Sequence, residues 1–209
     1  MSIESLTPAA YRSEDLSLIE AFARIVAIVL GDQRFIERKI SHLKKDPLTG
    51  SFTRASLEHD AQRLWGEYCR LYTENAVAMI DMDHFKRIID TYGHQTGDAV
   101  ILRIADVIFR NIRRDDIIIR YGGEEFLVIL PDAGHNAARQ IMNRLRAERE
   151  ALDMCACTGT VTVSVGAAST PGSVQLALDK QIAIADSALY EAKRGGRNTV
   201  ITRTTAHSC

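Results

Sequence analysis

The order of hydrophobic and polar residues before residue 46 predicts one long helix with a single apolar seam. From Ser13, a helix N-cap followed by two acidic residues, the chain runs to Lys45 without proline and with one glycine. Two positions recur every seven residues with an offset of three, which is the a/d pattern of a coiled coil. Their residues are Ile19, Val26, Gln33 and Ile40, and Phe22, Val29, Ile36 and Leu43. The length of the repeat favours a parallel dimer, with packing of the helix on its own domain as the alternative.

Beyond Pro47 the pattern alternates between the helical and the strand period. Helices are predicted over residues 53–73, 97–113, 136–150 and 176–194, and strands over 76–81, 117–121, 126–130, 160–167 and 199–201. The second and third strands flank a Gly-Gly-Glu-Glu turn, which is a hairpin signal. We therefore expect an α/β (α+β) domain over residues 46–203, a helical segment over 1–45 before it and a short tail over 204–209.

Composition and charge exclude several classes of protein. The 209 residues are 46% hydrophobic and 25% charged, as in a soluble globular protein, and the net charge of -1 provides no field for nucleic acid or an anionic membrane. The longest apolar stretch, residues 21–30, contains Arg24 and is too short to span a bilayer. The four cysteines form no CxxC pair and no metal-ligand spacing with histidine. We therefore expect reduced thiols in the cytoplasm, with redox work by Cys155 and Cys157 as the alternative.

Two pairs of acidic residues lie where predicted strands end or turn. Asp81 and Asp83 follow an apolar strand, and Glu124 and Glu125 follow two glycines in the predicted hairpin. Neighbouring carboxylates repel each other, and a hard divalent cation with oxygen ligands relieves that repulsion. Ordinary solvated turn residues give the same pattern, so the residues alone leave both interpretations open.

The segment RYGGEEF at residues 120–126 resembles the signature of the GGDEF family, the diguanylate cyclases of bacterial signalling, in its GGEEF variant. Four further blocks match the family in order and spacing: DPLTG at 46–50, DMDHFKRIIDTYGHQTGD at 81–98, TVSVGAA at 162–168 and ADSALYEAKRGGRNTV at 185–200. The resemblance implies a five-stranded, antiparallel-rich sheet surrounded by helices, akin to the palm of nucleotidyl cyclases. It also implies a reaction in which two GTP molecules form cyclic di-GMP and pyrophosphate.

The same resemblance assigns roles to particular residues. Asp81, Glu124 and the backbone carbonyl of Met82 would bind Mg²⁺ or Mn²⁺, with Glu125 in support. Glu124 matches the residue credited with taking the proton from the ribose 3′-hydroxyl, and Lys86 would stabilise charge on the phosphates. The other substrate-binding residues would be His84 and Phe85 through their amides, His94 and Asp98 near guanine, Gly122 and Gly123 at the hairpin, and Lys193 and Arg197 at the triphosphate.

Regulation and assembly are also implied by the resemblance. Arg113 and Asp116 form an RxxD motif, and Arg144 matches a further arginine of the family's inhibitory site for the product, cyclic di-GMP. Surface salt bridges would give the same residue pattern. Each domain of the family holds one GTP, so the reaction needs a homodimer, which the N-terminal helix would hold together. The residues before Asp46 weakly resemble the tail of a sensory domain of the GAF type.

Two departures from the family pattern keep other functions open. Ile89 stands where the family has an asparagine that hydrogen-bonds guanine, and the loss of that bond is worth about 1–3 kcal/mol. The loop after DPLTG lacks the usual residues at Ser51, Thr53 and Ala55, which we expect to perturb the fold modestly. The alternatives to an active enzyme are therefore a weak or silent domain that senses GTP or cyclic di-GMP, a cyclase with relaxed purine choice, and a pure coiled-coil scaffold.

Overall fold

A computed structural model describes residues 44–57, 61–151, 161–171 and 176–205 of the chain. The chain divides into two compact units, Met1–His42 and Leu43–Cys209. Residues 1–43, and with them every position of the predicted heptad repeat, lie outside the described residues. No helix of the described residues has the length and apolar character needed to cross a bilayer.

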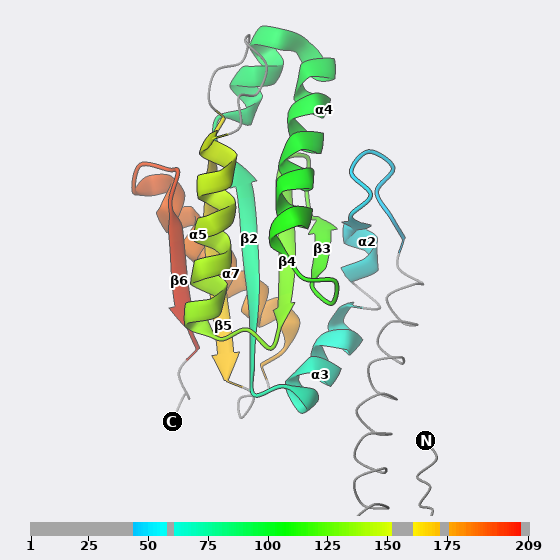
Figure 1. The fold of residues 1–209 in the computed structure, drawn as a ribbon, viewed down its shortest axis with the longest axis vertical. Helices are drawn as coiled ribbons and strands as arrows, with labels where there is room; N and C mark the ends of the chain where they lie inside the picture. Colours follow the sequence, from blue (N-terminus) through cyan, green and yellow to red (C-terminus); the bar gives the residue numbers. More distant parts are fainter. Residues whose placement is uncertain (1–43, 58–60, 152–160, 172–175, 206–209) are drawn as a thin grey trace, which may run out of the picture. The chain divides into compact units, whose positions relative to one another are not determined.

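The second unit is built on a six-stranded mixed sheet (Figure 1). Its strands are β1 (Phe52–Thr53), β2 (Glu74–Met82), β3 (Ile117–Arg120), β4 (Glu125–Pro131), β5 (Val163–Pro171) and β6 (Val200–Thr204), in the spatial order β1-β3-β4-β2-β5-β6. The central pairs β3/β4, β4/β2 and β2/β5 are antiparallel, and the outer pairs β1/β3 and β5/β6 are parallel. The α+β fold is therefore confirmed, with the two-residue strand β1 added to the five strands that were expected.

Helices cover both faces of this sheet. They are α2 (Arg54–Ser56), α3 (Gln62–Leu71), α4 (Phe85–Asn111), α5 (His135–Ala151) and α7 (Leu178–Arg194). In Figure 1, α4 and α5 lie in front of the sheet and α7 lies behind it. Strand side chains alternate between the faces, so Ala78 and Ile80 of β2 join the core under α4 and α5. Asp81 belongs to the opposite set, on the face that α7 covers.

Two predicted helices differ from the observed ones. The helix expected over 53–73 begins one residue later, at Arg54, because Thr53 pairs with Arg120 of β3 as part of β1. The helix expected over 97–113 is only the second arm of α4, which begins at Phe85 and is kinked at Gly93, where φ is 82° and ψ is 170°. The polar residues and two glycines around this kink interrupt the hydrophobic period, which hid the first arm.

Helix α7 approaches the sheet unusually closely at Gly166 of β5. A Cβ atom at this position would lie 2.1 Å from the backbone nitrogen of Leu189 and 2.2 Å from the carbonyl oxygen of Ala185. Both partners are backbone atoms in the middle of α7, so they have no side-chain freedom with which to move aside. The close contact fixes the path of α7 over the sheet, and its last turn carries Lys193 to the end of β2.

Candidate functional site

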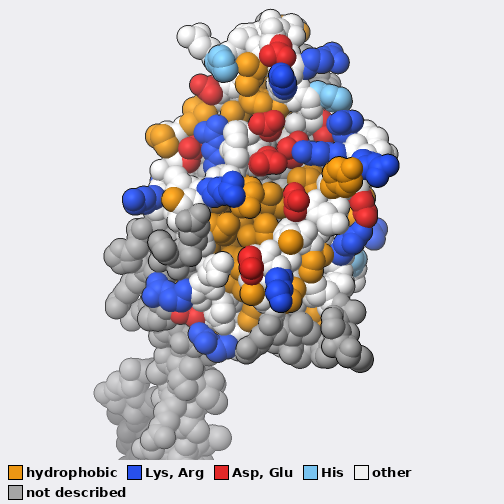
Figure 2. Space-filling view, turned by 180° about the vertical axis from the view of Figure 1, so that it is seen from behind, with side chains coloured by type: hydrophobic (Ala, Val, Ile, Leu, Met, Phe, Trp, Pro, Cys, Tyr) orange, Lys and Arg blue, Asp and Glu red, His pale blue; other side chains and the backbone are white. Residues whose placement is uncertain are grey.

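The predicted site forms where β2 ends and β4, β5 and β6 begin, at one end of the sheet. In the register of the sheet Asp81 lies beside Glu125 of β4 on one side and Ser164 of β5 on the other. Glu124 directly precedes β4. Figure 2 shows acidic side chains gathered in the upper half of the face seen from behind, with lysine and arginine side chains beside them. The carboxylates that the sequence places 43 and 44 residues apart are thus neighbours in space.

Asp81 has the most perturbed environment of these carboxylates. Asp81 is 6% exposed, and its Oδ2 atom lies 2.7 Å from Nζ of Lys193. Burial raises the pKa of Asp81 to about 6, although the ion pair with Lys193 opposes the shift, and the nearby charges of Glu125 and Glu124 raise it further. A buried carboxylate with two acidic neighbours and one ammonium is short of positive charge, which favours binding of a cation.

The donor set fits a cation that takes few ligands from the protein. Within the part of the chain that the structure describes, no three acidic, histidine or cysteine side chains are already gathered as a complete metal cage. Mg²⁺ is usually bound by one or two carboxylates and completes its octahedral shell with water and substrate phosphates. Asp81, Glu124 and Glu125 offer hard oxygen ligands of this kind, and backbone carbonyls at the strand ends can add to them.

The hairpin between β3 and β4 is tight, and its two glycines serve different purposes. The amides of Tyr121 and Gly122 both donate to the carbonyl oxygen of Glu125, at 2.8 and 3.3 Å. A Cβ atom on Gly122 would lie 2.5 Å from Oε2 of Glu125, so a glycine there lets that carboxylate lie against the turn. Gly123 has open space within 4 Å of an added Cβ, which leaves its backbone accessible to a ligand.

Arg120 ties the hairpin to the DPLTG loop. Its Nη2 donates to the carbonyl oxygen of Gly123 at 3.0 Å, and its Nη1 donates to both carboxylate oxygens of Asp46, at 3.1 and 3.3 Å. Burial alone would raise the pKa of Asp46, but hydrogen bonds from Thr49 and Arg120 outweigh it and hold this pKa below its ordinary value. The loop therefore braces the hairpin that carries Glu124.

Asp83 differs from Asp81, because hydrogen bonds from the protein occupy its carboxylate. Its carboxylate is 4% exposed and accepts three hydrogen bonds, from the hydroxyls of Thr162 (2.7 Å) and Ser164 (2.6 Å) and from the amide of Asn198 (3.0 Å). Both oxygens are thus already occupied by protein donors. Asp83 joins the end of β2 to the start of β5 and to the turn after α7. No sequence signal reveals this, because its partners lie 79 to 115 residues away.

The turn that Asp83 holds presents the predicted phosphate-binding residues. Arg197 and Asn198 both have left-handed backbones, with φ of 66° and 44°. The amide of Arg197 donates back to the carbonyl of Ala192 at 3.0 Å, which closes the end of α7. Lys193 and Arg197 therefore come from the last turn of α7 and the turn that follows it.

The first turn of α4 faces the same end of the sheet. His84 is the N-cap residue, with φ of 58° and ψ of 25°, and its carbonyl accepts the amide of Arg87 at 2.9 Å. Phe85 is buried, whereas Lys86 is exposed to solvent. The first amides of a helix have no partner within the helix, so the amides near His84 and Phe85 are available to an anion.

The predicted guanine contacts lie around the kink of α4. His94 and Asp98 are exposed on the second arm. Ile89 is half-buried and packs against the hydrophobic core, and its Cγ1 would lie 3.0 Å from a Cβ on Gly97. The apolar side chain thus fills the space between the two arms of α4.

The RxxD motif lies at the other end of α4. The amide of Arg113 donates to Oδ2 of Asp116 at 2.6 Å, and burial raises the pKa of Asp116 to about 6. On α5, Arg144 donates to the side-chain and main-chain oxygens of Asn111, both at 2.7 Å. Asn111 is two residues before Arg113. Arg144 of α5 therefore contacts the end of α4 from which the RxxD motif follows.

Comparisons with known proteins agree with this arrangement. The sequence model described as "Diguanylate cyclase, GGDEF domain" matches residues 43–199. The probable diguanylate cyclase DgcT of Escherichia coli K12 is 36% identical over 183 residues, which cover 83% of this chain and 38% of DgcT. The chain thus spans under two fifths of the length of this curated relative.

Solved structures of GGDEF domains share the fold of this chain. The coiled coil and GGDEF domain of DgcB from Caulobacter crescentus, in complex with c-di-GMP, has a TM-score of 0.69 at 30% identity, covering 91% of this chain and 100% of that one. The active GGEEF domain of a diguanylate cyclase from Vibrio cholerae has a TM-score of 0.68 at 26% identity, covering 74% of this chain and 98% of that one.

Proposed function

Because this chain belongs to the GGDEF family, whose members include the diguanylate cyclases, we propose that it condenses two molecules of GTP into cyclic di-GMP and pyrophosphate. The observation that carries the proposal is the buried Asp81, aligned with Glu125 in the sheet and ion-paired with Lys193. Carboxylates short of positive charge thus lie beside basic residues and free helix amides, which is the combination that a nucleoside triphosphate with its cation requires.

Asp81, Glu124 and the carbonyl of Met82 would hold Mg²⁺ or Mn²⁺, with Glu125 in support. When bound, such a cation lowers the pKa of the attacking hydroxyl and offsets charge on the phosphates. Glu124 would accept the proton of the ribose 3′-hydroxyl, because it lies at the hairpin beside the accessible backbone of Gly123. The 3′-oxygen of one GTP then attacks the α-phosphorus of the other, and pyrophosphate leaves in line with it.

The chain's basic groups would bind and orient the triphosphate. Lys193 and Arg197 reach it from the turn after α7, and Lys86 and the amides of His84 and Phe85 reach it from the start of α4. Charged hydrogen-bond donors placed around the leaving phosphates stabilise the charge that develops there in the transition state.

Recognition of guanine would rest on His94 and Asp98, with the hydrogen bond of the usual asparagine missing at Ile89. The packing of Ile89 against the core and beside Gly97 favours one second candidate, a cyclase with weakened GTP binding or relaxed purine choice. A domain that only senses GTP or cyclic di-GMP is the extreme form of the same departure.

Each domain would hold one GTP, so the reaction would take place in a homodimer. The N-terminal helix would supply that dimer through its heptad seam, and DgcB supports this as a relative in which a coiled coil precedes the domain. Arg113, Asp116 and Arg144 would bind cyclic di-GMP and inhibit the enzyme. We place the reaction in the cytoplasm, where GTP is supplied, with neither nucleic acid nor a membrane as a partner.

The test is to incubate the purified chain with GTP and Mg²⁺, with and without ATP, and to identify the products by mass spectrometry. Cyclic di-GMP that disappears in Glu124→Ala is the expected result, with Asp106→Asn, an exposed change far from the hairpin, as the matched control. A mixed purine product in the presence of ATP supports relaxed purine choice. A dimeric protein that binds GTP and forms no product contradicts the cyclase proposal and leaves the sensor.

A further inference from the structure

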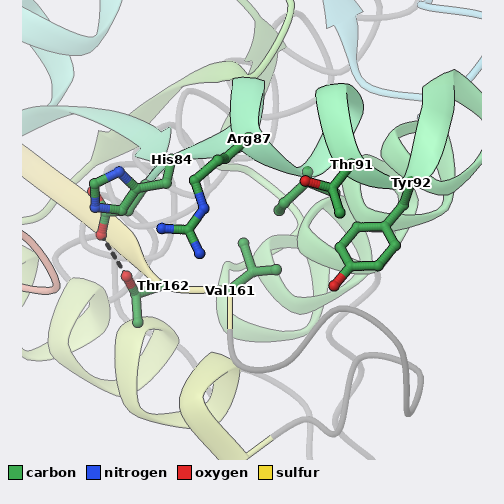
Figure 3. A pocket seen from close by; sticks show the side chains of 8 residues that line it. His84, Arg87, Thr91, Tyr92, Val161 and Thr162 are labelled. Carbon is green, nitrogen blue, oxygen red and sulfur yellow. Dashed lines mark hydrogen bonds between the residues drawn. The ribbon is translucent and has the colours of Figure 1, made fainter.

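A cavity of about 310 Å³ lies beside the first arm of α4 and adjoins the site described above (Figure 3). Its walls include His84, Arg87, Thr91, Tyr92, Val161 and Thr162, which come from α4 and from the residues leading into β5. Neither the acidic residues of the proposed metal site nor Lys193 lines it. Its volume is at the lower end of the range for small-molecule sites.

The helical period explains why this cavity is distinct from the proposed guanine site. Residues 84, 87, 88 and 91 recur at intervals of three and four, so they share one face of the first arm of α4. Ile89 lies on another face, towards Gly97 and the second arm. The same short helix thus separates the cavity, on the side of β5, from the residues predicted to meet the base.

The cavity is rich in hydrogen-bond donors. Figure 3 shows the side chains of Arg87 and His84 extending into it, with the hydroxyls of Thr91 and Tyr92 further along the helix. Arg87 and Thr91 have no side-chain hydrogen bond or ion pair to any other residue that the structure describes. The guanidinium group carries five donors in a planar fork that matches the oxygens of phosphate.

The described carboxylate in the wall forms no ion pair with Arg87. Asp83 also lines the cavity, but both of its oxygens accept protein hydrogen bonds, including the one from Thr162 that is drawn dashed in Figure 3. Among the described residues of its wall, the cavity therefore has one carboxylate whose oxygens already accept hydrogen bonds and several donors without a side-chain partner. Such a balance suits a ligand that is small and rich in acceptors.

We propose that this cavity is a second oxyanion site, in which Arg87 binds a phosphate group with help from the hydroxyls of Thr91 and Tyr92 and the imidazole of His84. The phosphate comes either from free phosphate or pyrophosphate, or from a mononucleotide whose remainder lies in the open mouth of the cavity. Thr162 links the site to Asp83 and, through it, to the turn that carries Arg197. The proposal does not depend on cyclase activity, because it concerns binding alone.

The test is isothermal titration calorimetry of the full chain, without divalent cation, against inorganic phosphate, pyrophosphate and GMP. The double variant Lys193→Gln/Arg197→Gln removes the two basic residues that α7 and its following turn bring to the proposed triphosphate site, and it is expected to keep the anion site at Arg87. In that background Arg87→Gln should weaken binding by roughly tenfold or more, since a charged two-point hydrogen bond is lost. Arg87→Lys keeps the charge without the fork, so its affinity should fall between the two.

Arg103→Gln, at an exposed position of the same helix but outside the cavity, is the matched control and should bind as its parent does. Tighter binding of pyrophosphate than of GMP identifies a free anion as the ligand, and the reverse identifies a nucleotide. Three results would each overturn the proposal. They are an affinity that Arg87→Gln leaves equal to that of the double variant, a loss of all anion binding in the double variant, and no binding of any probe by the unmodified chain. Thermal melts of each variant show that the protein remains folded.

Discussion

Replacing Asp83 with asparagine tests whether a residue outside the proposed metal site holds the site together. The carboxylate accepts hydrogen bonds from Thr162, Ser164 and the amide of Asn198, all at 3.0 Å or less. Asparagine has nearly the same shape, but it offers one acceptor oxygen and turns the other position into a donor. The hydroxyl of Ser164 can rotate to accept from the new amide, whereas the backbone amide of Asn198 can only donate.

The size of the effect follows from the loss of charge. A hydrogen bond to a charged group contributes about 1.5–3 kcal/mol, and a neutral one contributes about 0.5–1.5 kcal/mol. Three bonds that each lose about 1 kcal/mol would cost about 3 kcal/mol, from which the easier desolvation of an amide is subtracted. We expect Asp83→Asn to lower the free energy of unfolding by about 2 kcal/mol, on the same principle. We expect it also to weaken the binding of GTP, because the turn that carries Arg197 is no longer fixed.

Urea unfolding followed by tryptophan fluorescence measures the first effect. Trp65 is the single tryptophan, and it is 2% exposed in α3, so its emission reports on unfolding of the domain. Asp106→Asn is the matched control, because Asp106 is exposed in an ion pair with Arg110 and its loss should cost under about 0.5 kcal/mol. If Asp83→Asn and Asp106→Asn unfold at the same urea concentration, the assigned role of Asp83 is wrong.

Three further changes test other parts of the structure. Ile89→Asn places a polar group beside the proposed guanine site and should tighten GTP binding roughly 5- to 150-fold relative to ATP. Competition titrations measure the ratio of the two affinities, and an unchanged ratio contradicts the contact assigned to this position. Arg120→Ala should lower the free energy of unfolding by about 1–2 kcal/mol, because Asp46 and the Gly123 carbonyl lose the donor that they share. Denaturant titration measures this loss, and an unchanged free energy of unfolding would show that these hydrogen bonds do not stabilise the domain. Asp116 has a folded-state pKa of about 6 against 3.8 for the free group, so the native state holds its proton more tightly and stability falls as pH rises from about 4 to about 6. Asp116→Asn should remove that part of the pH dependence, and an identical pH profile of unfolding in the variant would refute it.

The pairing of Asp81 with Glu125 could be predicted from the sequence more readily than the local backbone of α4. Asp81 and Glu125 lie side by side because alternating apolar residues fix the register of β2 against β4, and that alternation is readable in the sequence. The first arm of α4 was missed because its polar residues and Gly93 break the helical period. The role of Asp83 could not be predicted, since it depends on a hydroxyl and an amide that only the folded sheet brings together.

The cavity beside α4 was missed for a related reason. Arg87 and Thr91 look like ordinary exposed residues of an amphipathic helix, and periodicity gives no sign that a second wall stands opposite them. That wall is formed by Val161 and Thr162, at least 70 positions further along the chain. Spacing within one segment cannot reveal a hollow that depends on how two distant segments meet.

The ion pair between Lys193 and Asp81 has a thermodynamic consequence for the order of binding. In the proposed function the cation binds Asp81 and the triphosphate binds Lys193. The ion pair must therefore separate before either residue can bind its ligand. A cation arriving alone has to displace the ammonium, and a nucleotide arriving alone leaves a buried carboxylate without its counterion. When both arrive together, each supplies the charge that the other removes. Cation and nucleotide are therefore expected to bind with positive coupling, so that each raises the affinity for the other by the same factor.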